Sequence, residues 1–179
     1  MSFPAIFLDR DGTINIEKNY LYRYEDWEWI PGALEALKLF SSSGYRIVVI
    51  TNQAGVARGY YTEEDVIKLH HKIDRDLATL EISIDAYYFC PHHPDFGSHG
   101  HCQCRKPEPG LIKQAQKDLD INLQGSWLIG DKLSDINAGL SAGVRPVLVA
   151  TGYGWKEVQK LPTGVPYVRD LFEASQLIL

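Results

Sequence analysis

Three short motifs in the sequence combine carboxylates with a hydroxyl and a lysine, which are groups that phosphate chemistry uses. They are residues 9–13 (DRDGT), 51–53 (TNQ) and 130–135 (GDKLSD). Two carboxylates ~4 Å apart would repel by about 4 kcal/mol at an intermediate effective dielectric, unless a cation or a proton relieves them. Because the carboxylates offer only oxygen ligands, we expect the hard ion Mg²⁺.

The first motif offers both a nucleophile and a proton donor. Asp9 and Asp11 would point to opposite faces of a strand, so both can reach one centre only if the chain turns, and Gly12 permits a turn. One carboxylate could then attack phosphorus to form an aspartyl phosphate, while the other protonates the leaving alkoxide and later activates water. The residues alone do not decide which aspartate is the nucleophile.

The phosphoryl oxygens also need partners. The Thr51 hydroxyl and a lysine would hold them, and both Lys106 and Lys132 are candidates. An isolated D-x-D-G motif is more often a surface turn or a weak calcium loop than a catalytic site. The EF-hand version of such a loop is excluded, because Ile14 and Tyr20 stand where that loop requires Gly and Glu.

A second set of metal ligands lies between residues 90 and 104. Cys90 and His92 form one close pair and Cys102 and Cys104 another, which suits a closed tetrahedral zinc site. Four protein ligands leave no position open for substrate, so we expect this zinc to be structural. The C-x-H spacing favours His92 over the competing ligands His93, His99 and His101.

Cations gather close to this loop in the sequence. Arg105 and Lys106 follow Cys104 directly, and Arg58 follows the TNQ motif. Together they indicate a substrate with more negative charge than a single phosphate. A solvated arginine that precedes a helix is an equally simple interpretation of Arg58.

The motifs must be positioned by strands and helices, and the apolar pattern predicts an alternation of the two. Runs that are apolar on both faces predict buried strands at 5–8, 45–51, 86–90, 126–130 and 145–149. A capping box and the spacing of Val66, Leu69, Ile73, Leu77 and Leu80 predict a helix over 62–80. Shorter helices are expected at 32–40, 110–119, 134–142 and 170–179.

This alternation predicts an α/β fold, with a doubly wound, mainly parallel, Rossmann-like sheet. In such sheets ligands bind beyond the carboxyl ends of the strands, where the three motifs would meet. The alternation breaks at 91–109, a proline-rich stretch without a periodic apolar pattern, and so long a loop needs something to hold it. There is no room for a large cap domain between the motifs.

Length and composition set further limits. The 179 residues are expected to form one domain, and a net charge of -5 argues against broad nucleic-acid binding. We expect no signal peptide, because the first residues lack its basic and apolar regions, and no apolar run is long enough to span a membrane. We therefore expect a cytoplasmic protein, a monomer, with a small-molecule substrate.

The four motifs Asp9-x-Asp11-x-Thr13, strand-ending Thr51, Lys106 and Gly130-Asp131-x-x-x-Asp135 resemble those of the haloacid dehalogenase superfamily of phosphatases. The resemblance implies that Asp9 is the nucleophile and Asp11 the acid and base. It implies that Thr51 and Lys106 stabilise the phosphoryl group. It also implies that Mg²⁺ is held by Asp9, Asp131 and the backbone carbonyl of Asp11.

Within that superfamily, the zinc ligands and the sequences CRKP and TNQAGVARG make residues 4–152 similar to the heptose-bisphosphate phosphatases. This resemblance implies an enzyme that removes the 7-phosphate of a heptose bisphosphate, in a pathway that supplies nucleotide-activated heptose for lipopolysaccharide core. It implies substrate contacts from Glu17, Tyr20, Thr51, Asn52, Gln53, Ala54, Arg105, Lys106 and Lys132.

Other interpretations remain open at this level. A histidinol-phosphate phosphatase would use the same zinc loop and nucleophile motif, although Arg105 favours a bisphosphate. A receiver-like signalling domain would be phosphorylated on aspartate without turning over, but Asp11 is placed to activate water. A binding module organised by zinc would not need Asp9 at all.

Overall fold

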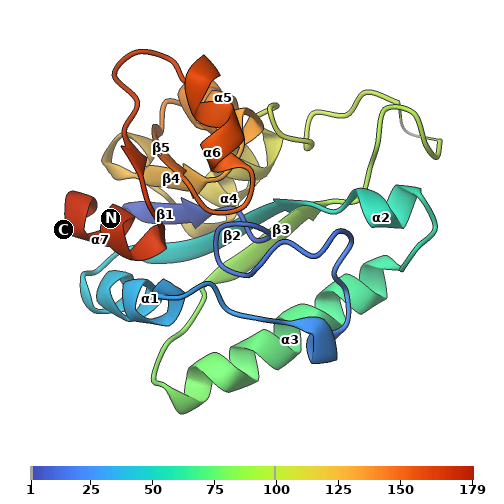
Figure 1. Cartoon of the computed structure of the whole chain (residues 1–179), viewed down its shortest axis with the longest axis horizontal. Helices are drawn as coiled ribbons and strands as arrows, with labels where there is room; N and C mark the ends of the chain where they lie inside the picture. Colours follow the sequence, from blue (N-terminus) through green and yellow to red (C-terminus); the bar gives the residue numbers. More distant parts are fainter. Residues whose placement is uncertain (1, 99) are drawn as a thin grey trace.

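A six-stranded parallel sheet forms the centre of the protein in the computed structural model, which describes residues 2–98 and 100–179 (Figure 1). The strand order is β3-β2-β1-β4-β5-β6, and every neighbouring pair is parallel. The strands are β1 (Ala5–Leu8), β2 (Arg46–Asn52), β3 (Ala86–Cys90), β4 (Trp127–Gly130), β5 (Arg145–Val149) and β6 (Tyr167–Val168). The chain extends from β1 to both sides, so the carboxyl ends of β1 and β4 border the crevice where such sheets bind ligands.

Helices cover both faces of this sheet. Figure 1 shows α1, α3 and α7 along its lower side, and the buried residues of α4 and α5 pack against the other face. The α-helices are α1 (Ala33–Ser42), α2 (Ala54–Ala57), α3 (Glu63–Thr79), α4 (Gly110–Leu119), α5 (Leu133–Ala142), α6 (Gly154–Glu157) and α7 (Leu171–Ile178). Short 3-10 turns are η1 (Tyr24–Asp26), η2 (Leu123–Gly125) and η3 (Val158–Lys160).

The alternating side chains of β1 explain why the strand is apolar throughout. Ile6 and Leu8 belong to the core beneath α1 and α3, whereas Phe7 belongs to the core beneath α4 and α5. All three are completely buried. Burial on both faces fixes the register of β1 beside β2 and β4, so the first polar residue after it, Asp9, emerges at the carboxyl edge.

The predicted fold class is confirmed, and the five predicted strands and five predicted helices are all present within two residues of their expected ends. The pattern missed β6, α2 and α6, because elements of two and four residues are too short to show a period. One buried position was wrong. Leu80 was expected on the inner face of α3, but the helix ends at Thr79 and Leu80 is 41% exposed.

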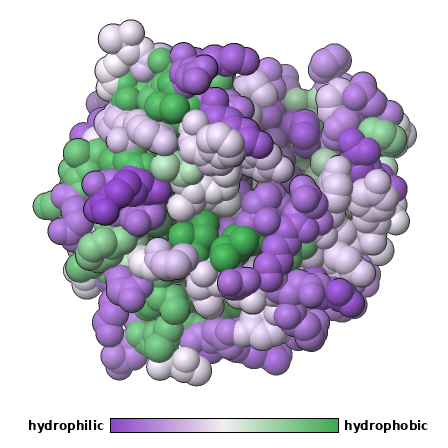
Figure 2. Space-filling view, in the orientation of Figure 1, coloured by the Kyte–Doolittle hydropathy of each residue, from purple (hydrophilic) through white to green (hydrophobic). Residues whose placement is uncertain are grey.

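The segment between β3 and α4 has no helix or strand among its described residues, as predicted. None of the helices in the described part of the chain is both long and apolar enough to span a membrane. Figure 2 shows a face that is mostly polar, with hydrophobic side chains in small separate patches. The polar motifs that the sequence singled out meet at the carboxyl edge of the sheet.

Candidate active site

The carboxyl ends of the central strands open into a pocket of about 440 Å³. It is lined by residues at or just beyond the carboxyl ends of β1, β2 and β4, including Asp9, Thr51 and Lys132. Lys106 reaches the same pocket from the end of the 91–109 segment. The sheet topology thus brings together motifs that are far apart in the sequence.

Three buried carboxylates form the centre of this pocket. Asp9, Asp131 and Asp135 each place an oxygen within 4.8 Å of the others, and none is more than 5% exposed. Lys106 Nζ lies 2.7 Å from Asp9 Oδ1 and 2.7 Å from Asp135 Oδ1. It also donates to the Ile50 carbonyl at 2.8 Å, so its position is fixed from three sides.

The charge balance of this cluster calls for a cation. Burial, and then the negative charges of Asp9 and Asp135, raise the pKa of Asp131 to about 8. Asp131 Oδ1 is buried and has no hydrogen-bond partner among the described residues. An unpaired oxygen beside further carboxylates is a site that fits Mg²⁺, which prefers oxygen ligands.

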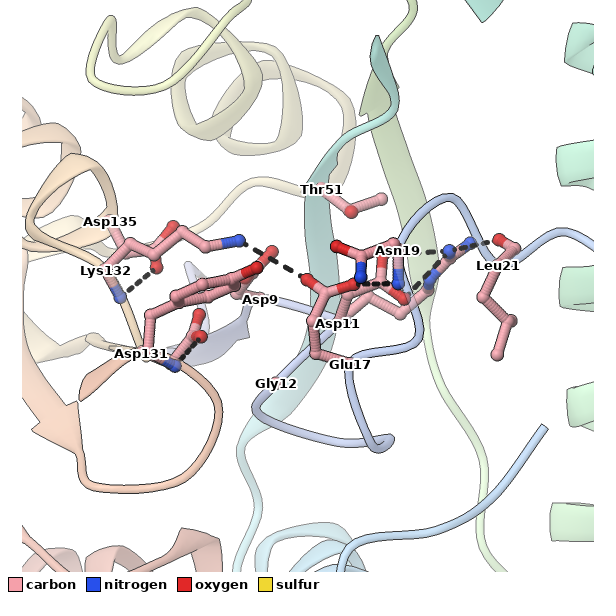
Figure 3. Close-up of polar contacts among 12 residues, drawn as sticks. Asp9, Asp11, Gly12, Glu17, Asn19, Leu21, Thr51, Asp131, Lys132 and Asp135 are labelled. Atoms are coloured by element: carbon pink, nitrogen blue, oxygen red, sulfur yellow. Dashed lines mark hydrogen bonds and ion pairs between the residues drawn. The ribbon is translucent and has the colours of Figure 1, made fainter. Parts of the chain in front are cut away.

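The predicted magnesium ligands differ in one respect from the observed cluster. The Asp11 carboxylate lies across Asp9 from Asp131 and Asp135 (Figure 3). Asp11 could therefore contribute to this cluster only through its backbone, as the resemblance implied. The predicted magnesium ligands did not include Asp135, although the motif that contains it was expected at this edge. Its carboxylate also accepts a hydrogen bond from the Lys132 backbone N–H at the start of α5, at 3.0 Å.

The turn after β1 requires glycine. Gly12 has a φ of +89°, and a Cβ there would collide with the Asp131 carboxylate. Thr151 Oγ1 donates to the Gly12 carbonyl at 2.7 Å, and the Tyr153 N–H donates to Asp131 Oδ2 at 2.8 Å. Our sequence analysis missed residues 151–153, although they follow β5 and the same strand-end rule would have found them.

Asp11 is held by several donors. Arg10 Nη2 lies 3.0 Å from its Oδ1 and 2.9 Å from its Oδ2, and Asn15 and Gln53 each donate to it at 3.0 Å. Burial acts to raise the pKa of Asp11. The charge of Arg10 and the hydrogen bonds from Asn15, Arg10 and Gln53 outweigh burial and lower that pKa overall.

The residues of the TNQ motif line the pocket, and their side chains also form hydrogen bonds with other residues of the protein. Gln53 Nε2 donates to Thr51 Oγ1 at 2.9 Å, and Gln53 Oε1 accepts from the Tyr61 hydroxyl at 2.7 Å. The Asn52 amide donates to the Lys106 carbonyl at 3.1 Å and accepts from the Lys106 N–H at 3.0 Å. Asn52 therefore fastens Lys106 in place, a role that the sequence did not reveal.

Other predicted contacts surround the pocket. Its lining includes Glu17, Tyr20, Ala54, Arg105 and Lys132. The Lys132 ammonium lies 3.6 Å from the Glu17 carboxylate, and Arg105 donates to the His92 carbonyl at 3.1 Å.

Arg58 does not join the pocket lining. Its guanidinium lies 4.0 Å from the centre of the Phe96 ring and 5.7 Å from that of Tyr20. The helical turn α2 separates Arg58 from the TNQ motif, and Arg58 lies against Phe96 of the 91–109 segment, so its substrate contact stays a prediction.

The predicted zinc ligands converge. The Cys104 sulfur lies 3.0 Å from that of Cys90, 3.3 Å from that of Cys102 and 3.3 Å from His92 Nδ1. With zinc bonds of about 2.0–2.3 Å, the edges of a ligand tetrahedron measure about 3.5–3.8 Å, so the donor set fits zinc after a small expansion. Among the described residues, this group contains neither His93 nor His101, and His99 lies outside the described residues.

Comparison with known proteins identifies the family. The D-glycero-beta-D-manno-heptose-1,7-bisphosphate 7-phosphatase of Yersinia pestis is 44% identical over 156 residues, which are 84% of this chain and 82% of that protein. The chain belongs to this phosphatase family. The Escherichia coli K12 member is 42% identical over 155 residues, 84% of this chain and 81% of that protein. Residues 103–174 also match the HAD-hydrolase-like family model.

Solved structures agree with this membership. The D,D-heptose 1,7-bisphosphate phosphatase from B. bronchiseptica, complexed with magnesium and phosphate, has a TM-score of 0.89 at 35% identity. The alignment covers 98% of this chain and 97% of that chain. Haloacid dehalogenase phosphatases use Mg²⁺, and the acidic cluster of this family member has the oxygen ligands that such an ion requires.

Proposed function

We propose that the protein removes the 7-phosphate of D-glycero-β-D-manno-heptose 1,7-bisphosphate and leaves the 1-phosphate. The reaction type is supported by the buried cluster of Asp9, Asp131 and Asp135, with Lys106, at the carboxyl edge of the sheet. The substrate follows from the names of relatives that are 42–44% identical over most of the chain. The product would feed the synthesis of nucleotide-activated heptose for lipopolysaccharide core.

Asp9 attacks the phosphorus in the first step. A new bond forms between an Asp9 carboxylate oxygen and phosphorus, and the bond from phosphorus to the sugar oxygen breaks. Asp11 gives a proton to that departing oxygen, so the sugar leaves as an alcohol rather than an alkoxide. Because the surrounding donors lower the pKa of Asp11 in the free protein, Asp11 takes up this proton when the anionic phosphate enters the pocket and its negative charge raises that pKa. In the second step Asp11 takes a proton from water, and the water oxygen forms a bond to phosphorus. The bond between phosphorus and the Asp9 oxygen breaks, which releases inorganic phosphate and restores the Asp9 carboxylate.

The remaining groups hold the phosphoryl oxygens. Lys106 sits 2.7 Å from Asp9, close enough to contact a phosphoryl group on that carboxylate, and Thr51 lines the same pocket. Asp9, Asp131 and the Asp11 backbone carbonyl would hold Mg²⁺, with Asp135 beside them. When bound, Mg²⁺ neutralises negative charge on the phosphoryl oxygens.

The zinc loop would contribute to substrate selection. Cys90, His92, Cys102 and Cys104 bind zinc in this proposal, and the ion holds the chain that carries Arg105. Arg105 lines the pocket and donates to the His92 carbonyl, so zinc and substrate contact are linked through one short segment. A fixed arginine suits the second phosphate of a bisphosphate.

Turnover and product analysis test the proposal. Purified protein with Mg²⁺ should convert the β-heptose bisphosphate to the 1-phosphate, with lower kcat/KM for the α-anomer and for histidinol phosphate. Asp9→Asn should abolish turnover, lowering kcat by more than about 10³-fold, because no nucleophile remains.

Efficient hydrolysis of histidinol phosphate with negligible hydrolysis of the heptose bisphosphate would reject the assigned substrate. Stable phosphorylation of Asp9 without release of phosphate would favour a receiver-like domain. If the function of the protein does not depend on Asp9, as Asp9→Asn would show, a binding module is favoured.

A further inference from the structure

Arg10 is a buried cation that the reaction described above does not use. Its side chain is 1% exposed, although burying a guanidinium is costly unless its charge and its donors are satisfied. Arg10 Nη2 donates to the Leu21 carbonyl at 2.9 Å as well as contacting Asp11, and Figure 3 draws the contact that ends on Leu21. Such an arrangement calls for an explanation beyond folding, because an apolar residue would fill the space at lower cost.

The contacts on Asp11 restrict how its carboxylate can rotate. Arg10 contacts both oxygens, Asn15 donates to Oδ1 and Gln53 donates to Oδ2. A rotation about the bond that carries the carboxylate would break contacts on both sides at once. Tyr61 in turn holds Gln53, so the orientation of Asp11 is set by surrounding residues.

The guanidinium is itself anchored from α3. Arg10 Nη1 lies 3.4 Å from His70 Nε2. A guanidinium only donates hydrogen bonds, so His70 Nε2 must accept and the ring must be neutral. Burial, and then the positive charge of Arg10, lower the pKa of His70 to about 3, which keeps this neutral form present across the neutral pH range.

His70 is held in turn by its neighbours. Its ring stacks on Tyr87 with centroids 4.3 Å apart and planes at 14°. The Tyr87 hydroxyl donates to Asp74 Oδ1 at 2.7 Å, and Asp74 lies one helical turn after His70 on α3. A continuous set of contacts therefore runs from α3 through His70 and Arg10 to Asp11.

We propose that Arg10, anchored by His70, is a positioning residue that aims the Asp11 carboxylate at the leaving oxygen of the substrate. The inference rests on the proposed role of Asp11 as proton donor. It also assigns a part in the reaction to α3, which carries none of the catalytic motifs. Disturbing this anchor should slow reactions in which the leaving oxygen needs a proton, and should spare reactions in which it does not.

The test compares two phosphate esters. Heptose 1,7-bisphosphate has a poor alkoxide leaving group, whereas 4-nitrophenyl phosphate releases a stable phenolate that needs little protonation. The parameter is kcat/KM, because it reports the steps up to the first irreversible one and excludes the later attack of water. His70→Phe keeps a flat ring to stack on Tyr87 but removes the acceptor for Arg10. His70→Gln restores a polar group near the position of Nε2.

We expect His70→Phe to lower kcat/KM for the heptose bisphosphate by about 10-fold and for 4-nitrophenyl phosphate by less than about 2-fold, since general acid catalysis contributes about 10²–10⁴-fold in total. His70→Gln should recover most of the loss. His71→Phe is the matched control, because it makes the same change at the next, exposed position of α3, and it should leave both values unchanged.

Equal losses on the two esters, or no loss on either, would overturn the inference. If His70→Phe does not fold, Arg10→Lys provides the same comparison, because it keeps the charge but loses the second donor branch. Asp11→Asn separates the inference from the proposed function. An unchanged ratio of the two esters in Asp11→Asn would reject Asp11 as the proton donor. A changed ratio in Asp11→Asn with an unchanged ratio in the anchor variants would reject only the positioning role.

Discussion

At the scale of single residues, the site is defined by charges that the protein alone leaves unbalanced. Asp131 has one oxygen that accepts from the Tyr153 N–H, and another that is buried and has no hydrogen-bond partner in the described part of the chain. Its pKa is raised to about 8 by burial and by its neighbours, so ionised Asp131 is costly until a cation arrives. The feature that we propose to bind Mg²⁺ should therefore weaken the fold when Mg²⁺ is absent.

Asp131→Asn tests whether this carboxylate both weakens the fold without Mg²⁺ and responds to Mg²⁺. Without Mg²⁺ the variant should be more stable than the wild type by about 1–2 kcal/mol, because it removes a buried carboxylate yet keeps an oxygen for the Tyr153 N–H. Wild-type protein should gain about 2.7 kcal/mol at a Mg²⁺ concentration 100 times its Kd, and the variant should gain almost nothing. Thermal unfolding with and without Mg²⁺ measures both effects. Asp76→Asn on α3 is the control, and a variant that still responds to Mg²⁺ would contradict the assigned ligand.

At the scale of elements, α3 connects the core to the site through one histidine. His70 is 3% exposed on the inner face, next to Leu69 and one turn before Asp74. Its pKa in the folded protein is about 3, whereas an unfolded histidine has a pKa of about 6.5. Because the folded value is lower, the contribution of His70 to stability is complete above pH ~6.5 and is lost as the pH falls towards 3.

Urea unfolding at two pH values tests this assignment. Between pH ~7.5 and ~5.5 the wild type should lose about 1.4 kcal/mol through His70. His70→Phe should lack this part of the pH dependence, while His71→Phe should keep it. Equal pH dependence in the wild type and His70→Phe would show that His70 titrates normally.

The conformation of the 91–109 segment, like the link between α3 and the site, depends on a few contacts. No helix or strand holds its described residues, and its ligand atoms lie close enough to share one ion. Arg105 and Lys106 follow directly on Cys104, so loss of zinc should move both.

Cys102→Ser should therefore lower the zinc content, the melting temperature and the affinity for substrate. We expect KM for the heptose bisphosphate to rise by about 10-fold or more, since about 1.4 kcal/mol of binding energy corresponds to a factor of ten. Elemental analysis and steady-state kinetics check the two parts. Full zinc content in the variant would contradict the assigned ligand set.

At the scale of the whole molecule, the C-terminal helix completes the core beneath the sheet. Leu171 of α7 is completely buried in the same core as Leu37 of α1, whereas Leu177 is 50% exposed. The last nine residues thus stabilise the fold, far from the carboxyl edge that carries the site.

Leu171→Ala should lower the free energy of unfolding by about 2–4 kcal/mol, because it removes buried methyl groups and leaves a cavity. Leu177→Ala, the same change on the exposed face of α7, should alter stability by less than about 0.5 kcal/mol. KM should stay unchanged in both folded variants. Chemical denaturation measures the difference, and equal stabilities would mean that α7 does not pack as described.

The sequence by itself determined the parallel α/β architecture, the three strand-end motifs and the group of Cys90, His92, Cys102 and Cys104 that the structure brings together. Strands that are apolar on both faces and short metal-ligand spacings are local signals, so they can be read without knowing the fold. One position was wrong: the helical period predicted a buried Leu80, but the helix ends at Thr79 and Leu80 is exposed. Arg58 lies against Phe96 after the turn α2, so its substrate contact stays a prediction.

Only the tertiary structure decided which side chains meet. It brought Thr151 and Tyr153 to the turn after β1 and connected His70 to Arg10 across 60 positions of the sequence. It also set which carboxylates share the cluster, with Asp135 inside it and the Asp11 carboxylate on the other side of Asp9. Contacts of this kind depend on how helices and strands pack around the carboxyl edge, and packing between distant segments leaves no periodic signal in the chain.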